Sequence, residues 1–226
     1  MSQLAHDTTG QDDKGLLPYH HAHHFNDADH EFEASKEGMW IFLVTEVLMV
    51  GAIFVGYLLL RNLYPEAFAA AHKLLNVKLG ALNTVILITS SVTMVLGVTA
   101  AQRSQRKKAI QMLSLTILLG FGFLIVKYFE YSHKFHEGIL PAGKFTYEGL
   151  ANVPKAPLFF SMYFMLTGVH AFHVVVGMLL IGWVILRLRK GEIHGGFYTP
   201  VELVGFYWHF VDLVWIYLFP LLYLLG

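Results

Sequence analysis

Five ionisable side chains of this sequence lie deep inside long apolar stretches, where each of them needs a partner. They are Glu46, His170, His173, His209 and Asp212. An ionisable group in a bilayer costs roughly 2.5–3.5 kcal/mol on insertion scales, so it is retained for chemistry or for structure. The chemistry that these residue types support is proton transfer or metal binding, and the structural alternative is a hydrogen bond between helices.

Glu46 lies seven residues into the first apolar stretch, which is about 10 Å along a helix axis. No Lys or Arg lies within one helical turn of it. We therefore expect Glu46 to be protonated or hydrogen-bonded to another helix. A proton-handling role linked to proton uptake is one interpretation, and a structural hydrogen bond is the one that we favour.

His170 and His173 are spaced i, i+3, which places both imidazoles on one face of a helix. Two imidazoles can bind a metal ion or a haem. A dinuclear or bis-haem centre needs further ligands, however, and only His209 lies comparably deep. We favour hydrogen bonding for these histidines and expect neither a metal site nor a redox cofactor in this chain.

Glu202, His209 and Asp212 lie on the last apolar stretch. Glu202 and His209 are two turns apart on one face, and Asp212 follows His209 at i+3. A buried Asp beside a His can share a proton or a hydrogen bond. We expect an intramembrane polar cluster in which these three residues meet His170 and His173. We favour a structural contact that holds the helices together over a chain of groups that conducts protons.

Two other arrangements resemble metal sites, but they lack the remaining ligands. Glu130 and His133 have the Glu-x-x-His spacing of carboxylate di-iron bundles, which need a second copy and two more carboxylates. Lys127 suggests that this stretch lies at the membrane rim. A run of four histidines in the first segment could bind copper or zinc transiently, but an unstructured tail without a metal role is favoured: His20, His21, His23, His24.

The elements that must position these groups are five apolar stretches. Hydrophobic residues make up 55% of the chain and charged residues 14%, against roughly 25% charged in a soluble domain. At about 1.5 Å per residue the stretches cross a bilayer core of about 30 Å, and in lipid they must be helices. The sequence therefore predicts an all-α integral membrane protein, a bundle of five transmembrane helices at about 39–60, 79–101, 109–126, 157–186 and 200–225.

Charge divides the chain into a tail and a membrane domain. Residues 1–38 contain eight acidic and two basic residues, which predicts an acidic, His-rich, flexible tail before a membrane domain over 39–226. Loops 102–108 and 187–199 carry seven bases in 20 residues, whereas the opposite loops carry seven in 48. The positive-inside rule then places the N-terminus in the cytoplasm and the C-terminus outside.

Composition excludes other classes of protein. The 16 basic and 16 acidic residues cancel, so a basic nucleic-acid-binding domain is not expected. The sequence has no cysteine, which excludes disulfides, iron–sulfur clusters and Cys-ligated zinc. Arg187 follows 30 residues without a charged side chain, and at a helix end it can reach a lipid phosphate.

Several sequence blocks resemble subunit III of haem–copper oxygen reductases, the cytochrome c oxidase type. The run from Tyr207 to Asp212, followed by Val214 and Trp215, is similar to the last helix of that subunit. Four further blocks occur in family order, and together they cover roughly residues 34–226: Thr45-Glu46-Val47-Leu48, Leu82-Asn83-Thr84, Glu130-Tyr131, and Thr167 to His170 with Phe172-His173-Val174 and Gly177.

The resemblance implies a non-catalytic subunit of a proton-pumping cytochrome c oxidase in aerobic respiration. Such a subunit packs directly on the haem- and copper-bearing subunit I, beside subunit II and in some enzymes a small subunit IV. It holds phospholipid and supports proton uptake by subunit I. By position, Glu46 matches the family's buried carboxylate, and Arg187 matches an arginine that contacts a lipid headgroup.

The resemblance also indicates the type of organism, and it leaves alternative functions open. The longest family members have two more N-terminal helices, whereas five-helix forms occur in bacterial oxidases, so a bacterial cytoplasmic membrane is expected. A quinol oxidase subunit III is the main alternative. A relative associated with nitric oxide reductase and a stand-alone proton-coupled transporter are more remote. Membership of a respiratory supercomplex stays open.

Overall fold

The computed structural model describes residues 28–139, 146–150, 152–153, 155–193 and 197–225. Within them, five helices are long and apolar enough to cross a membrane, and no strand is present. The predicted all-α fold with five membrane helices is therefore confirmed. The long helices are α1 (Ala28–Leu63), α3 (Val77–Gln102), α4 (Arg106–His136), α5 (Ala156–Lys190) and α6 (Thr199–Phe219).

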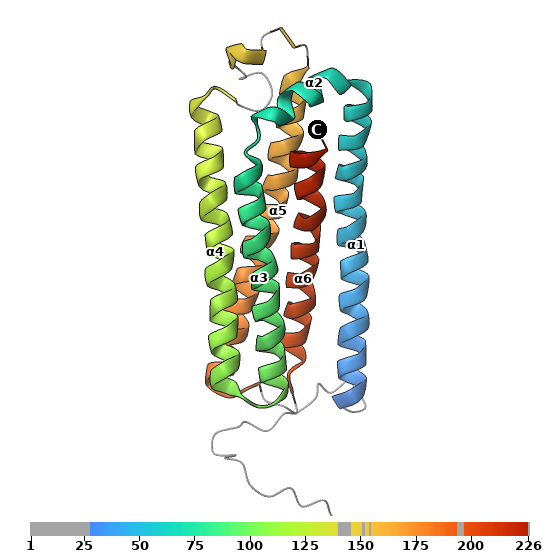
Figure 1. The fold of residues 1–226 in the computed structure, drawn as a ribbon. Helices are drawn as coiled ribbons and strands as arrows, with labels where there is room; N and C mark the ends of the chain where they lie inside the picture. Colours follow the sequence, from blue (N-terminus) through green and yellow to red (C-terminus); the bar gives the residue numbers. More distant parts are fainter. Residues whose placement is uncertain (1–27, 140–145, 151, 154, 194–196, 226) are drawn as a thin grey trace, which may run out of the picture.

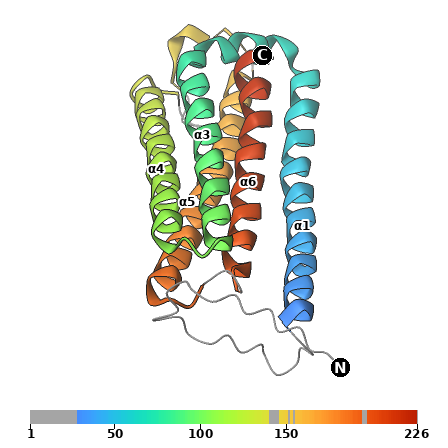
Figure 2. The ribbon, with the colours of Figure 1, turned by 60° about the horizontal axis from the view of Figure 1, so that its bottom comes forward.

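Short elements lie at the end of the bundle that carries the C-terminus (Figure 1). They are α2 (Pro65–Ala71), the 3₁₀ turns η1 (His72–Leu74) and η3 (Glu148–Leu150), and a terminal π-helical turn, η4 (Pro220–Leu224). The opposite end holds the start of α1, the α3–α4 turn and the end of α5, as Figure 2 shows from that side. The two predicted basic loops therefore lie at the same end as the start of α1.

α1 begins earlier than the sequence predicted. We assigned residues 28–38 to the tail, whereas they form the first turns of α1. Lys36 explains the difference, because it lies 4.1 Å above the Phe32 ring and pairs with Glu202 of α6 at 3.0 Å. The first contact has the i, i+4 spacing of a helix, and the second joins this segment to α6. The four histidines at 20–24 lie outside the described residues.

α4 continues ten residues beyond its predicted end at 126. Lys127, Glu130 and Lys134 follow at i, i+3 and i+7, so they share one face, and each is at most 4% exposed. We expected Lys127 at the membrane rim, but its side chain points into the protein. The helix extends because these charges find partners inside the bundle instead of water.

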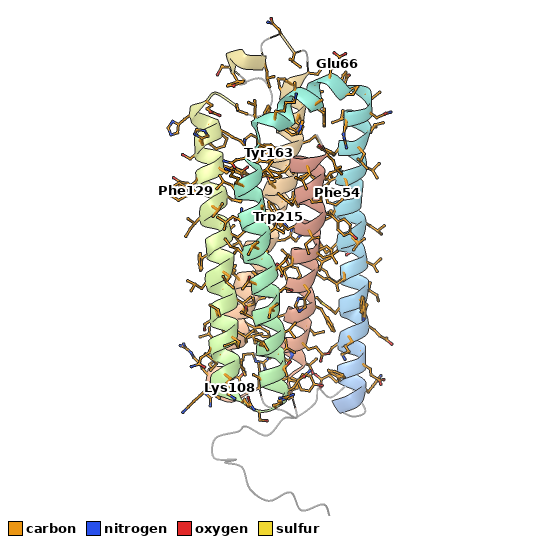
Figure 3. The ribbon with its side chains drawn as sticks, in the orientation of Figure 1. Phe54, Glu66, Lys108, Phe129, Tyr163 and Trp215 are labelled. Carbon is orange, nitrogen blue, oxygen red and sulfur yellow. The ribbon has the colours of Figure 1, made fainter. Side chains whose placement is uncertain are left out.

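Close packing joins α3, α4, α5 and α6 around Trp208, which is fully buried. A Cβ on Gly177 would meet the Trp208 ring at 2.7 Å, and one on Gly120 would meet it at 3.1 Å. Glycine at these two positions lets α4 and α5 approach the indole. Figure 3 shows Tyr163 and Trp215 in the same interior, with Phe129 and Lys108 on the outside.

α1 stands apart from the other helices (Figure 1). Only 11% of its most apolar window is buried within the chain, against 50% for the last span. Its apolar side chains therefore need lipid or another subunit as their surroundings.

Candidate functional site

Glu46 of α1 and His173 of α5 form a pair between helices that the sequence does not place together. Glu46 Oε2 lies 3.1 Å from His173 Nε2, and both side chains are mostly buried. On its other side, His173 Nδ1 lies 2.7 Å from the Val169 carbonyl oxygen. The Tyr207 hydroxyl donates to the backbone carbonyl of His173 at 3.2 Å, so α6 also supports the pair.

The contacts of His173 assign a role to each ring nitrogen. A carbonyl oxygen only accepts, so Nδ1 is the donor in its contact with Val169, and Nε2 is the nitrogen that faces the Glu46 carboxyl. This arrangement can exchange a proton, but it also simply joins α1 to α5.

The pair lines a groove of about 770 Å³ between α1, α5 and α6. The groove is largely apolar, with Phe42, Trp183 and Tyr207 among its lining residues. Its other acidic lining residue is Glu31, near the start of α1. A groove of this volume and lining suits an acyl chain or another apolar ligand.

Arg187 lies beside the same groove, at the end of α5. Its guanidinium lies 5.1 Å from the Trp183 ring and 5.9 Å from the Phe197 ring, and both rings line the groove. Arg187 Nε donates to Glu192 at 2.7 Å. The residue is therefore held by a carboxylate at its own helix end, close to the groove.

The five residues expected to form one intramembrane polar cluster lie instead at separate contacts. Glu202 pairs with Lys36, and His209 Nδ1 lies 2.7 Å from the Ser91 hydroxyl of α3. His173 faces Glu46, as described above. His170 packs between aromatic rings, and the ring nitrogens of His170 and both carboxylate oxygens of Asp212 have no hydrogen-bond partner among the described residues.

A row of hydrogen bonds joins α3 to α6. Trp208 Nε1 donates to the Ser90 hydroxyl at 3.1 Å, and Trp215 Nε1 donates to the Thr84 hydroxyl at 3.0 Å. Together with the contact between His209 and Ser91, they align these antiparallel helices. The indole N–H groups of α6 thus find partners on one helix, and we regard these bonds as structural.

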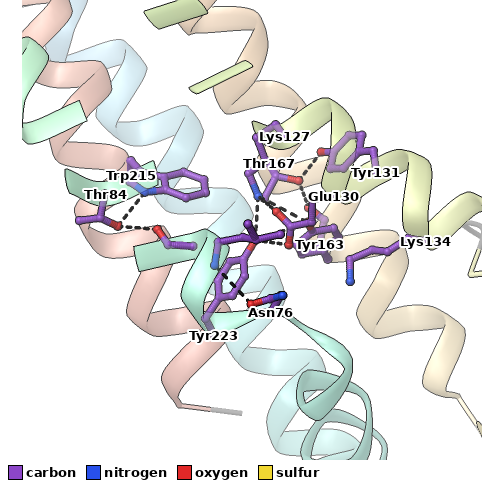
Figure 4. A network of polar contacts seen from close by, with 12 residues as sticks. Asn76, Thr84, Lys127, Glu130, Tyr131, Lys134, Tyr163, Thr167, Trp215 and Tyr223 are labelled. Carbon is purple, nitrogen blue, oxygen red and sulfur yellow. Dashed lines mark hydrogen bonds and ion pairs between the residues drawn. The ribbon is translucent and has the colours of Figure 1, made fainter. Parts of the chain in front are cut away.

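A network of buried polar side chains that was not predicted from the sequence lies near the C-terminal end (Figure 4). Lys127 Nζ donates to Glu130 at 2.9 Å and to the hydroxyls of Tyr223 and Tyr163 at 2.7 and 3.4 Å. The Tyr223 hydroxyl donates in turn to the other Glu130 oxygen at 2.7 Å. The network joins α4, α5 and η4, so it anchors the last turn of the chain.

Two further contacts extend this network toward its surroundings. Lys134 Nζ donates to the Leu74 carbonyl of η1 at 3.2 Å, and Tyr131 is hydrogen-bonded to Thr167. The sequence contained one usable signal, the spacing of Lys127, Glu130 and Lys134 on one helical face. It contained no signal for Tyr223, which is 93 residues from Glu130.

No group of three or more His, Asp or Glu side chains in the described part of the chain is arranged to hold a metal ion. Glu130 is engaged by Lys127 and Tyr223, while His133 pairs with Glu137 at 3.1 Å. The Glu-x-x-His spacing is therefore used for two unrelated contacts.

Comparison with known proteins decides the family. The family model for cytochrome c oxidase subunit III matches residues 20–226. The chain belongs to this family. The resemblance seen in the sequence is confirmed, and it now extends over nearly the whole chain.

Relatives within the family differ in their electron donor. The cytochrome c oxidase subunit 3 of Corynebacterium diphtheriae is 35% identical over 188 residues, 82% of this chain and 85% of the relative. The quinol oxidase subunit 3 of Bacillus subtilis is 29% identical over 212 residues, 91% of this chain and 97% of the relative. This family member is thus a subunit III homologue of the haem–copper oxidases, with both donor types among its relatives.

A third relative joins two subunits in one polypeptide. The haem–copper oxidase subunit I+III of Aeropyrum pernix is 30% identical over 195 residues, and this chain spans 22% of its length. In that protein a subunit III region is covalently continuous with subunit I.

Proposed function

We propose that this chain is the non-catalytic subunit III of a proton-pumping cytochrome c oxidase. In this role it stabilises subunit I, binds phospholipid and supports proton uptake during oxygen reduction, while haem and copper are held by the partner subunits. The observation that carries the proposal is the family match over residues 20–226.

The contacts of the deep histidines support a role without redox centres. His173 and His209 are engaged by Glu46 and Ser91, and His170 packs against Phe123 and Trp215. The nitrogens that make these contacts in His173 and His209 are engaged by protein groups, and His170 is enclosed by aromatic rings, with no group of three or more ligand-bearing side chains around it in the described part of the chain. The proposed contribution of Glu46 to proton uptake is supported by its contact with the His173 imidazole at 3.1 Å.

Direct packing on subunit I is supported by the exposed apolar surface and by the fused relative. α1 leaves most of its apolar window uncovered within the chain, and the relative from Aeropyrum pernix carries regions I and III together. Subunit II, a small subunit IV and a respiratory supercomplex are further proposed partners. The proposed location is the bacterial cytoplasmic membrane, with the tail in the cytoplasm.

The groove between α1, α5 and α6 is the proposed phospholipid site. Its volume of about 770 Å³ and apolar lining suit acyl chains. Arg187 lies behind two of its aromatic lining residues, where its guanidinium can approach a phosphate.

Quinol is the second candidate for the electron donor. Several relatives are named quinol oxidase subunit 3, and the one from Bacillus subtilis covers more of this chain than the cytochrome c oxidase subunit from Corynebacterium diphtheriae. Because the donor is oxidised by other subunits, the two candidates are distinguished by assaying the purified complex with reduced cytochrome c and with a quinol.

Gentle detergent extraction of the tagged chain from its native membrane tests the proposal. We expect it to bring down a larger haem-bearing chain, together with the optical spectrum of an oxidase and bound phospholipid. Recovery of the tagged chain alone, from membranes with oxidase activity, would contradict the proposal. Oxidation of quinol but not of cytochrome c would replace the donor and leave the accessory role intact.

A further inference from the structure

Three buried polar side chains in the centre of the bundle have no hydrogen-bond partner among the described residues. They are Asn83, His170 and Asp212, each at most 3% exposed, and six of their polar atoms are unsatisfied. A buried polar atom left without a partner costs about 1–3 kcal/mol. Three such residues in one small bundle therefore require a ligand that the protein side chains do not supply.

Asp212 faces α3 between two hydrogen bonds that fix its position. It lies four residues after Trp208, which bonds Ser90, and three residues before Trp215, which bonds Thr84. Residues three and four apart share a helical face, so the Asp212 carboxyl lies in the same interface, one turn from each bond.

Among the described residues, Ser91 is the one side chain near enough to act on the carboxyl as a hydrogen-bond partner, and its hydroxyl also contacts His209 Nδ1 at 2.7 Å. A hydroxyl has a single proton to donate, so Ser91 serves at most one carboxylate oxygen of Asp212. Asn83 directly precedes Thr84, which bonds Trp215, so Asn83 lies at about the height of Trp215 along the bundle. This height is within one helical turn of that of the Asp212 carboxyl. Both ends of its amide are unsatisfied as well.

His170 lies at the same level of the bundle. Its ring is 5.2 Å from the Trp215 ring and 5.3 Å from the Phe123 ring. A small cavity of about 10 Å³ lies beside His170 between α1, α5 and α6. This volume is close to the roughly 10–15 Å³ that one water molecule requires. The other residues that line the cavity are apolar except His173, and Asp212 and Asn83 are not among them.

The Lys127 network begins beside these groups. Lys127 Nζ lies 4.7 Å from the Trp215 ring, which also contacts His170, and its charge is close enough to act on that histidine. Polar groups therefore continue from Trp215 and Lys127 to Glu130 near the C-terminal end (Figure 4).

We propose that ordered water occupies the core of the α3–α6 bundle and binds Asp212, Asn83 and His170. Water is the ligand whose chemistry fits, because it donates to a carboxylate or amide oxygen and accepts from an amide or imidazole N–H. The site is internal and distinct from the apolar groove at Glu46. It does not depend on which electron donor the oxidase uses.

Radiolytic hydroxyl-radical labelling of the intact oxidase tests the proposal, because bound water is the local source of the radical. Phe123, beside His170, and Phe159, in an aromatic cluster with Tyr57 and Phe68, are both fully buried. We expect Phe123 to be oxidised several-fold faster than Phe159. Equal rates for the two rings would overturn the proposal.

Two variants and a density map sharpen the test. His170→Leu should bring Phe123 labelling down toward that of Phe159, whereas His170→Asn, which keeps two polar ends, should retain it. If His170→Leu does not assemble, the comparison within the wild-type chain still decides. In a density map of the complex that resolves other buried waters, we expect water peaks within hydrogen-bond distance of Asp212 and His170. Absence of water density at both residues in such a map would also overturn the proposal.

Discussion

Removing one partner of the buried Lys127–Glu130 pair should destabilise this chain more than removing both. The two side chains are 5% and 3% exposed and lie 2.9 Å apart. A buried charge that loses its partner typically costs about 3–5 kcal/mol, whereas replacing both charges is often close to neutral. The perturbations are Lys127→Met, Glu130→Gln and the double variant.

The structure also predicts which single variant is worse. Glu130 interacts with Lys134 as well as with Lys127, so it keeps a positive neighbour in Lys127→Met. The free energy of unfolding should therefore fall by about 3 kcal/mol in this variant. Glu130→Gln leaves Lys127 without a carboxylate partner and Lys134 with Glu137 alone, and its loss of stability should be nearer about 5 kcal/mol. The double variant should be more stable than either single variant, so with these single losses the coupling energy should exceed about 5 kcal/mol.

Reactivity of a unique buried cysteine provides the assay. The chain has no cysteine, and Ala109 is fully buried, so Ala109→Cys places one protected thiol in α4. Labelling of this thiol in the purified complex, followed by mass spectrometry against denaturant concentration, gives the free energy of opening. Glu66→Gln is the matched control, since Glu66 is exposed at the start of α2 and should change stability by under about 0.5 kcal/mol.

Single losses of stability that simply add in the double variant would mean that Lys127 and Glu130 contribute independently, contrary to this prediction. A loss in Glu66→Gln as large as in Glu130→Gln would show that burial of the charge is not the cause.

Three further predictions follow from individual contacts. Gly177→Ala should cost about 1–3 kcal/mol by overpacking, because its Cβ would meet Trp208 at 2.7 Å, whereas Gly182→Ala meets nothing within 4 Å and should be neutral in the same thiol assay. Tyr223→Phe removes a hydrogen bond to Glu130 and should cost about 1.5–3 kcal/mol, measured as earlier release of the chain from the complex on heating. Glu46→Gln should leave initial oxygen reduction by the assembled oxidase nearly intact in an oxygen-electrode assay, and an immediate, complete loss of turnover would contradict the minor role of Glu46.

The number of membrane helices could be predicted because bilayer thickness dictates the length of each apolar run. Helix ends could not be predicted in the same way. Lys127 marks the end of an apolar run, yet α4 continues because that lysine bonds Glu130 and Tyr223 inside the protein. A hydropathy pattern detects the charge but not the distant hydroxyl that receives it.

The sequence indicated that Glu46 needs a partner but could not identify it. The partner, His173, is 127 residues away, and it is selected by how α1 and α5 are rotated against each other. The same rotation separates His170 from His173. Residues at i, i+3 differ by about 60° around a helix, so His173 reaches the groove while His170 points into the core.

The absence of a redox centre from this chain is tested most directly by the haem and metal content of the polypeptide after its release from the purified oxidase. We expect all haem and copper to stay with the other subunits, because the deep histidines of this chain serve contacts between helices. Recovery of the folded chain with its own stoichiometric haem or copper would show instead that it carries a redox centre.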